Sequence, residues 1–291
     1  MAALGCTGPI AEIFVEGFLK QGVSLRLLAR DAAAVARRYP KAEVVSGSMM
    51  VADDVAKALQ GVDAAFLTTP MGLRNDPTLE IEAARAAIAG AKAAGLKHLI
   101  YISVLGADER RGVGILDSKY EIERLLAGSG VPYSVVRCGS YMEDVFDARL
   151  KLLKKGRFLF PVTKSRRFSY TSQKDVAPFV VNMLLTKKRI LQGHVNLVVP
   201  ETYSVSEVEQ HLSSASGRRV VAAPKFPTFY LFLALKPYFN WKGHRFSSII
   251  PLIEYFDVHG YTATTKTVGE LFPTFRMTGL DEHLKALFKR A

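Results

Sequence analysis

Cysteine and histidine, which crosslink chains or bind transition-metal ions, are scarce among the 291 residues. Cysteine occurs only at Cys6 and Cys138, which excludes a disulfide framework and favours a reducing compartment, so we expect a cytoplasmic location. The cysteines lack C-x-x-C spacing and the six histidines are scattered, so the sequence predicts no metal site. A Gly-x-Ser-x-Gly turn, which holds the nucleophile in many hydrolases, is also absent.

Long apolar runs are missing as well. No stretch reaches the roughly 18 apolar residues of a membrane-spanning helix, and the nearest approach, Phe226–Trp241, is interrupted by Pro227, Lys236 and Pro237. Met1–Gly22 contains two glutamates and lacks the basic start of a signal peptide. We therefore expect neither a membrane span nor a secretion signal.

Acidic residues are few in the second half of the chain. Residues 1–150 contain 17 Lys and Arg against 18 Asp and Glu, whereas residues 151–291 contain 22 against 9. Eight basic residues and no acidic one lie between Lys151 and Lys174. Such a segment could bind nucleic acid, an anionic membrane surface or an anionic ligand, or form a solvated basic loop. Because no recognition module accompanies it, we do not expect a nucleic-acid partner.

Strand-like and helix-like segments alternate, with short breaks, up to Arg137. The predicted strands are Val23–Ala29, Ala42–Ser46, Asp63–Thr68, Lys97–Ser103 and Pro132–Arg137. The predicted helices are Pro9–Gln21, Ala32–Arg38, Val51–Leu59, Pro77–Ala94 and Asp117–Ala127. Nearly continuous apolar strands are typical of a sheet that is covered on both faces. The repeated order predicts an α/β fold with a doubly wound, Rossmann-type parallel sheet.

The pattern loosens after Arg137, and we expect a smaller α/β region there. Its predicted elements are a helix over Ser172–Leu185, a strand over Val195–Val199, a helix that begins with the capping-box spacing of Ser204 and Glu207, and a final helix from Gly279. We predict a sheet domain at residues 1–150 and a C-terminal region at residues 151–291, which interleaves with the sheet domain and covers its cleft.

A glycine-rich turn, Gly5-Cys6-Thr7-Gly8-Pro9-Ile10-Ala11, follows the first predicted strand. Between a buried strand and a helix, such a turn lets backbone N–H groups approach a pyrophosphate at the positive end of the helix. Gly5 would form the tight turn, Gly8 would allow the close approach, and Ala11 takes the place of the third glycine. Only Met1–Leu4 precede the turn, so either the first strand is short or the natural chain starts earlier.

The second predicted strand ends at Arg30, about where NAD-binding proteins carry an acidic residue for the ribose hydroxyls. The planar guanidinium of an arginine suits a phosphate instead, so we expect NADP rather than NAD. Asp31 follows directly, and its other interpretation is a helix N-cap.

Further candidates follow the other strands, since ligands of a doubly wound sheet bind outside the carboxyl ends of its strands. Ser48 and Met49 could lie along the adenine, and Thr69, Pro70 and Met71 beside the middle of the dinucleotide. Ser103 ends the next strand, Lys119 lies in the first turns of the following helix, and Tyr141-Met142-Glu143-Asp144 follows the sixth strand.

These segments together resemble the NmrA-like branch of the atypical short-chain dehydrogenase/reductases, which includes isoflavone-reductase-type enzymes, NADPH-dependent quinone reductases and proteins thought to sense the NADPH/NADP ratio. The resemblance covers roughly residues 4–220, and its most specific part is Lys119–Asp144. It implies that Gly5–Ala11 binds the pyrophosphate, Arg30 the 2′-phosphate, and Lys119 the region of the nicotinamide ribose. Tyr141–Asp144 matches the family's aromatic-led cofactor segment.

Two positions depart from the expected pattern. The family usually has an acidic residue after the glycine of the third strand's turn, where this chain has Ser48. Ordinary dehydrogenases of the superfamily carry a tyrosine four residues before the lysine as general acid, and here that residue is Ile115. The usual Tyr-Lys pair is therefore missing. The complete set of expected cofactor contacts is Gly5, Cys6, Thr7, Gly8, Pro9, Ile10, Arg30, Ser48, Met49, Thr69, Pro70, Met71, Lys119, Tyr141, Met142, Glu143 and Asp144.

Hydride transfer from a nicotinamide requires the protein to orient the cofactor and to stabilise or protonate the developing oxyanion. We predict Lys119 and Ser103 as the catalytic groups, as a cation and a hydrogen-bond donor. The alternatives are a solvent-facing Lys119 paired with Glu123 on the same helix, and a strand-end hydroxyl of Ser103 that bonds to a loop.

The sequence thus favours an NADPH-dependent reductase of a small apolar carbonyl, quinone or enone. The apolar run Phe226–Leu235 would cover the substrate, or else belong to an ordinary core. Because Ile115 leaves no general-acid tyrosine, a second possibility is an NADP(H)-binding regulator without turnover, which would report redox state to a protein partner. A third is a structural subunit of a larger, membrane-associated assembly, which the basic and aromatic segments would suit.

Overall fold

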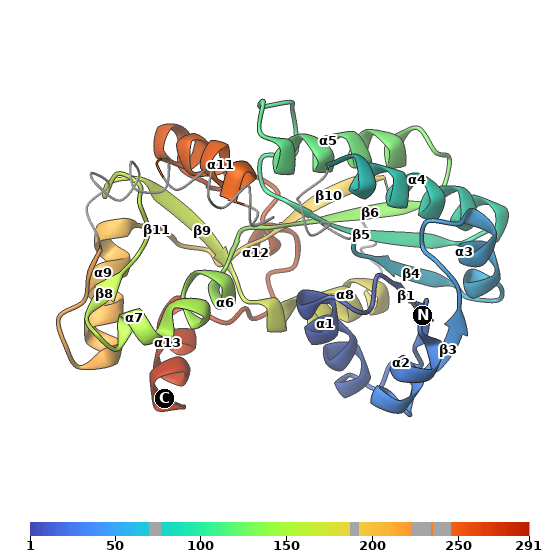
Figure 1. The fold of residues 1–291 in the computed structure, drawn as a ribbon, viewed down its shortest axis with the longest axis horizontal. Coiled ribbons are helices and arrows are strands. Elements are labelled where there is room, and N and C mark those ends of the chain that lie inside the picture. Colours follow the sequence, from blue (N-terminus) through green and yellow to red (C-terminus); the bar gives the residue numbers. More distant parts are fainter. Residues whose placement is uncertain (70–76, 187–191, 223–233, 235–245, 291) are drawn as a thin grey trace. The chain divides into compact units, whose positions relative to one another are not determined.

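The computed structural model describes residues 1–69, 77–186, 192–222, 234 and 246–290 (Figure 1). Internal contacts divide the chain into two compact units. The first unit takes the described residues up to Arg137 together with Gln173–Val195, and the second takes Cys138–Ser172 and the described residues from Asn196 onward. The units are thus interleaved in sequence, and among the described residues the chain first passes from one to the other after Arg137.

A seven-stranded sheet forms the centre of the first unit, in the order β10-β6-β5-β4-β1-β2-β3. Its strands are β1 (Ala2–Leu4), β2 (Arg26–Ala29), β3 (Glu43–Ser46), β4 (Ala64–Leu67), β5 (His98–Val104), β6 (Tyr133–Cys138) and β10 (Gly193–Leu197). β1 pairs in parallel with both β2 and β4, so the strand order reverses there. This order is that of the doubly wound dinucleotide-binding sheet, which confirms the predicted fold class.

The central strand β1 contains only three residues, all buried. Leu4 lies opposite Leu28 of β2 on one side and Leu67 of β4 on the other. Pairing on both sides compensates for the shortness of β1, because each of its residues is paired with a residue of both neighbouring strands.

Helices cover both faces of this sheet (Figure 1). They are α1 (Pro9–Lys20), α2 (Ala32–Arg38), α3 (Ala52–Leu59), α4 (Pro77–Ala93), α5 (Gly114–Ala127) and α8 (Gln173–Leu185). Leu67 of β4 belongs to the core formed with α3, α4 and α5. Its neighbour Phe66 points to the other face, where its ring packs edge-on against Phe14 and Phe18 of α1 at centroid distances of 5.4 and 4.9 Å. Because successive side chains of a strand point to opposite faces of the sheet, β4 contributes to the core on each face.

The predicted helices and strands of this unit are all present, with shifts at some ends. α5 begins at Gly114 instead of Asp117, because the carboxylate of Asp117 accepts a 2.7 Å hydrogen bond from the N–H of Arg111 and holds the preceding loop rather than the helix start. β10 ends at Leu197 instead of Val199, since Val199 belongs to the second unit and its N–H bonds to the carbonyl of Tyr170 within that unit.

The described part of the second unit contains two small sheets and mainly short helices. Its strands are β7 (Ser140–Tyr141), β8 (Arg157–Phe158), β9 (Arg167–Thr171), β11 (Thr202–Ser204) and β12 (Val221–Ala222), in the orders β11-β9-β7 and β12-β8. Its helices are α6 (Met142–Val145), η1 (Asp147–Arg149, a 3-10 turn), α7 (Leu150–Leu153), α9 (Val205–Ser216), α11 (Phe246–His259), α12 (Val268–Leu271) and α13 (Leu280–Lys289).

Two predicted helix starts of this unit are confirmed. Ser204 and Glu207 form the expected capping box at α9, and Gly279 is the N-cap of α13. The predicted apolar run Phe226–Leu235 lies, apart from Ala234, outside the described residues. None of the helices in the described part of the chain is both long enough and apolar enough to cross a bilayer.

Candidate functional site

The turn after β1 is built around Gly5. Its φ of +84° favours glycine, and a Cβ added there would lie 2.2 Å from the carbonyl oxygen of Thr68. The Thr68 hydroxyl donates a 2.8 Å hydrogen bond to the carbonyl of Gly5. The glycine turn is therefore locked against the end of β4, the neighbouring strand at the switch point.

Gly8 has a different environment from Gly5. It is the N-cap of α1 with ordinary extended backbone, it offers no side-chain cap, and a Cβ added there would meet no atom within 4 Å. Pro9 occupies the first helical position. Space beside an uncapped helix N-terminus is the arrangement that receives phosphate groups. Glu12, the acidic residue of this first turn, is bonded to Arg38 by a 2.8 Å contact.

The side chains of this turn point in opposite directions. Thr7 is exposed, whereas Cys6 is buried and its thiol lies 3.3 Å from the carbonyl of Leu28. Burial raises the pKa of the Cys6 thiol. Cys6 therefore offers a ligand its backbone rather than its sulfur.

At the end of β2, Arg30 is exposed and forms no ion pair with any residue that the structure describes. Asp31 is the N-cap of α2, and its carboxylate accepts a 2.9 Å hydrogen bond from Ala34. The N-cap interpretation of Asp31 is confirmed. The carboxylate of Asp31 is therefore bonded to α2, while the Arg30 guanidinium remains available to an anion.

The turn after β3 is closed by a carboxylate from α3. The N–H of Ser48 donates a 2.9 Å hydrogen bond to Asp54, and the Ser48 hydroxyl accepts one of 3.2 Å from Met50. Met49 is half-buried against the core. An acidic group is thus present in this turn, supplied by Asp54 rather than by the residue that follows Gly47.

The ammonium of Lys119 lies in a buried polar cluster formed by Lys119, Glu80, Thr69 and Ser118. Lys119 is 7% exposed and Glu80 of α4 is 2% exposed. Nζ of Lys119 bonds to Oε1 of Glu80 and to the Thr69 hydroxyl, the latter at 3.1 Å. Ser118 donates to Oε2 of Glu80 at 2.6 Å, and Thr69 donates to Oε1 at 2.5 Å. We call these four residues the Lys119 cluster.

The electrostatics of the cluster keep Lys119 charged. Burial alone lowers the pKa of a lysine, but the Glu80 carboxylate outweighs it and raises the pKa of Lys119 above its usual range. Tyr101 of β5 lies beside the cluster, with its ring centroid 5.3 Å from Nζ. Burial raises the pKa of Tyr101 well above that of a free tyrosine. A tyrosine therefore accompanies the lysine, but it is a poorer acid than one in water.

The alternative interpretation of Lys119, a solvent-facing lysine paired with Glu123, is wrong. Glu123 is instead paired with Arg137, whose Nη2 lies 2.6 Å from its Oε2. The hydroxyl of Ser103 donates a 2.6 Å hydrogen bond to the other oxygen of Glu123. Ser103 is therefore fixed by Glu123, and its O–H is already donated.

A chain of contacts joins the glycine turn to the Lys119 cluster within the first unit. Gly5 touches Thr68, the next residue is Thr69, and Thr69 bonds to Lys119. Three segments that are distant in sequence thus meet at the carboxyl ends of β1 and β4. Pro70 and Met71, which we expected beside them, lie outside the described residues.

The predicted segment Tyr141–Asp144 belongs to the second unit, where it forms the end of β7 and the start of α6. Met142 is buried, and Glu143 accepts a 2.8 Å hydrogen bond from Ser172. Loss of solvent, together with the neighbouring Cys138, raises the pKa of the Tyr141 hydroxyl. The cofactor contacts of this segment stay a prediction.

Sequence analysis missed Glu80, the residue on which the Lys119 cluster is centred. A signal was present, because Glu80 precedes the buried Ala83, Ala84 and Ala87 of α4 at helical spacing. A carboxylate on an apolar helix face needs a buried partner. The sequence alone did not indicate which of the chain's lysines and arginines that partner is.

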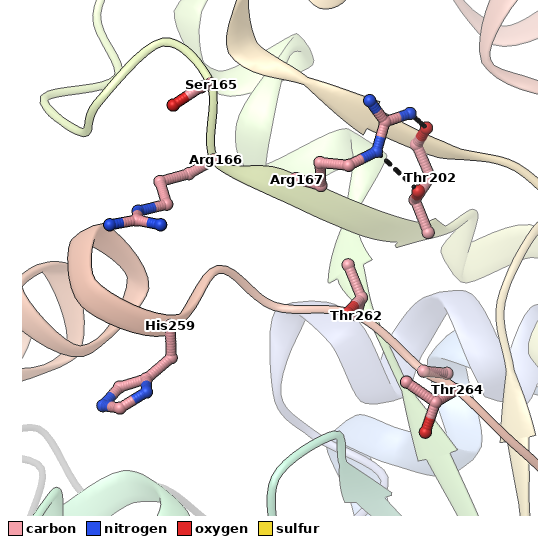
Figure 2. Close-up of a pocket in the computed structure, with 8 residues that line it drawn as sticks. Ser165, Arg166, Arg167, Thr202, His259, Thr262 and Thr264 are labelled. Carbon is pink, nitrogen blue, oxygen red and sulfur yellow. Dashed lines mark hydrogen bonds between the residues drawn. The ribbon is translucent and has the colours of Figure 1, made fainter.

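A cavity of about 390 Å³ lies within the second unit, between the start of β9 and the residues that follow α11 (Figure 2). Arg166, Arg167 and His259 are among its lining residues. Arg167 donates a 2.9 Å hydrogen bond to Thr202 and is paired with Glu207 at 3.0 Å. Because Thr202 and Glu207 already bind Arg167, we assign this cavity no role in the site.

Among the described residues, no group of three or more His, Cys, Asp and Glu side chains could hold a metal ion.

The sequence model of the NmrA-like family matches residues 1–284. An NAD(P)H azoreductase of Xenophilus azovorans is 28% identical over 222 residues, 75% of this chain and 74% of that protein. The photosystem II assembly factor Ycf39 of Trieres chinensis is 24% identical, over 99% of this chain and 92% of that protein.

Among solved structures, the NADPH-dependent quinone oxidoreductase QOR2 of Escherichia coli, complexed with NADPH, superposes with a TM-score of 0.77. It is 23% identical, and the match covers 99% of each chain. This likeness shows that the two chains share a fold.

Proposed function

Since the chain belongs to the NmrA-like family, we propose that it is an NADPH-dependent reductase of a small apolar carbonyl, quinone or enone. One observation carries the proposal. The contacts from Gly5 through Thr68 and Thr69 to Lys119 join a phosphate-type turn to a buried ammonium at the switch point of the sheet. A pyrophosphate site beside a fixed cation is what a nicotinamide enzyme needs.

The residues present fit NADPH. Open space beside Gly8 and an uncapped helix N-terminus would receive the pyrophosphate, and the exposed Arg30 would hold the 2′-phosphate. The azoreductase relative uses NAD(P)H by name, and the quinone oxidoreductase of the same fold binds NADPH. When bound, NADPH supplies the hydride.

Lys119 would act as a fixed positive charge and not as a proton donor. Its raised pKa means that the ammonium keeps its proton, so it stabilises an oxyanion or holds a ribose hydroxyl by charge and hydrogen bonding. Tyr101 does not replace the missing general acid, since its own pKa is raised. Ser103 remains a predicted donor, which its hydrogen bond to Glu123 disfavours.

The second candidate function is an NADP(H)-binding regulator without turnover. The observation that favours it is that both predicted catalytic groups already have partners within the protein. Lys119 is bonded to Glu80 and Thr69, and Ser103 is bonded to Glu123. One relative carries the name of an assembly factor, which describes a role with protein partners. Such a protein would bind the cofactor and pass its redox state to a partner.

One experiment separates the two functions. NADPH oxidation is followed with a panel of quinones and enones, and the affinity for NADPH alone is measured by calorimetry. The reductase proposal expects turnover with at least one member of the panel. Tight NADPH binding with no turnover on any member would leave the regulator, and failure to bind NADPH would contradict both.

The cofactor site itself is tested by Gly8→Val. A valine at this extended position meets no protein atom, so the fold should persist, while its methyl groups fill the space where the pyrophosphate would approach. We expect NADPH binding to be abolished. Gly279→Val is the matched control, because Gly279 is likewise a helix N-cap with extended backbone and open space, at the start of α13. Unchanged affinity in a folded Gly8→Val variant would contradict the assignment.

A further inference from the structure

Basic side chains from three distant segments gather at one end of the second unit. We call this surface the basic end. Its nine members, all exposed, are Lys151, Lys154, Lys155, Arg157, Arg218, Arg219, Lys285, Lys289 and Arg290. No Asp or Glu occurs in residues 148–158, 213–222 or 283–290, from which they come. The basic run that stands out in the sequence therefore supplies only part of this surface.

Direct contacts hold the three segments together. The Arg218 guanidinium donates a hydrogen bond to the carbonyl of Lys154, and the N–H of Val221 donates one of 3.0 Å to Gly156. α9 packs against α13, and Figure 1 shows α7, the loop after α9 and the end of α13 along the same side of this unit. A hollow of about 660 Å³ lies between them, lined in part by Lys154, Arg218, Lys285 and Lys289.

Most of the positive charge of the basic end has no acidic partner among the described residues. Lys154 aside, none of the nine side chains forms an ion pair within the part of the chain that the structure describes. Glu209, the acidic residue closest in sequence to Arg218, is bonded to Lys164 at 2.8 Å. The cavity of Figure 2 differs, since its Arg167 has Glu207 as a partner. The basic end therefore presents mostly unpaired cations among the described residues of this unit.

Exposed apolar side chains lie among these cations. Leu152 is 37% exposed and Val221 is 41% exposed, and Phe288 lines the hollow. A surface with this mixture suits anionic headgroups over hydrocarbon, whereas a nucleic acid gains most from exposed aromatic faces. No large aromatic side chain is exposed in the described residues. We propose that the basic end docks the protein on an anionic lipid membrane.

The proposal is tested on the full chain with lipid vesicles. Sedimentation is measured with vesicles of phosphatidylcholine, with and without phosphatidylglycerol, at low and high salt. We expect binding only to the vesicles that contain phosphatidylglycerol, and we expect salt to weaken it because the attraction is screened. Equal binding to both vesicle types, or binding to neither, would overturn the proposal.

Matched variants locate the surface. Arg218→Gln, Lys285→Gln and Lys289→Gln together remove three cations of the basic end, and at about fivefold per cation the affinity for vesicles should fall roughly a hundredfold. The control variant combines Lys57→Gln, Arg85→Gln and Lys92→Gln, which removes three exposed cations of the first unit. This control has the same net charge as the basic-end variant and should bind the vesicles almost as the wild type does.

Three outcomes decide the matter. Loss of vesicle binding in the basic-end variant but not in the control variant supports the proposal, provided that circular dichroism shows an unchanged fold. Equal loss in both variants would mean that net charge alone attracts the protein, and would overturn the assigned surface. Leu152→Asn should weaken vesicle binding a few-fold at unchanged charge. If it has no effect while a single-stranded RNA displaces the vesicles, the surface binds nucleic acid and the lipid proposal is wrong.

Discussion

Two sets of cations in this molecule differ in how the protein holds them. Lys119 is buried and shares the carboxylate of Glu80 with Thr69 and Ser118, whereas the nine cations of the basic end are exposed and lie in segments without acidic residues. A buried charge needs a partner, so its position is fixed and it can act on one atom of a ligand. Exposed charges act together through their field and suit a diffuse anionic surface.

Removing the carboxylate should give the largest effect on stability. Glu80→Ala leaves the Lys119 ammonium buried without its partner, and we expect the free energy of unfolding to fall by about 3–5 kcal/mol. Urea denaturation measures this. The double variant Glu80→Gln/Lys119→Met removes both charges and should lose less than the single variant, because no unpaired charge remains.

The matched control for that experiment is an exposed ion pair. Arg276 and Glu282 lie 3.1 Å apart, with side chains 85% and 56% exposed. Glu282→Ala should leave the stability nearly unchanged. If Glu80→Ala and Glu282→Ala have similar effects, the distinction between the two kinds of cation is wrong.

The buried cation should also dominate the chemistry. If Lys119 stabilises a transition-state oxyanion, Lys119→Ala lowers the turnover number about 10²–10³-fold with little change in NADPH affinity. Steady-state kinetics and calorimetry measure the two quantities, with Lys92→Ala as the control for an exposed lysine. A fall in NADPH affinity at unchanged saturated turnover would assign Lys119 to the ribose instead.

The sheet could be predicted from the sequence because its signals are local. Nearly continuous apolar strands, Gly5 and Gly8, and the Ser204–Glu207 capping box each act within a few residues, and the structure confirms the elements they predict. The first strand was the exception, since the three residues of β1 are stabilised by pairing on both sides. That pairing is a property of the folded sheet.

The partners in the site could not be predicted in the same way. Lys119 was singled out, but its bond to Glu80 joins α4 and α5, and the sequence equally allowed a pair with Glu123 on the same helix. The basic end likewise joins three segments, and only the first belongs to the basic run Lys151–Lys174. Contacts between distant segments depend on the packing of whole elements.

Arg30 is an exposed cation with a single expected ligand, so it should show an intermediate effect. Loss of a charge-assisted phosphate contact should cost about 1.5–3 kcal/mol, which is about 10- to 150-fold in NADPH affinity, while NADH affinity changes little. Calorimetric titration of Arg30→Ala with both cofactors tests this. Arg37→Ala, an exposed arginine of α2, is the control. If the ratio of the two affinities is unchanged, Arg30 does not select NADP.

The smallest of the expected effects is the change in the free energy of unfolding with pH, which should depend on Lys119. The folded state raises the pKa of Lys119 above the reference value of 10.5, so its contribution is fully present below that pH and is lost as the pH rises through the folded-state pKa. Above about pH 10.5 the unfolded chain releases a proton that the folded chain keeps, and stability falls by up to about 1.4 kcal/mol per pH unit. Urea denaturation on either side of this pH measures the slope.

The Glu80→Gln/Lys119→Met variant removes this titrating group and should show a shallower fall with pH. Tyr101 shifts in the same sense, because burial raises its pKa and the unfolded chain ionises first. Tyr101→Phe therefore measures its share separately. Parallel curves for wild type and the double variant would show that the Glu80 carboxylate does not hold the charge on Lys119.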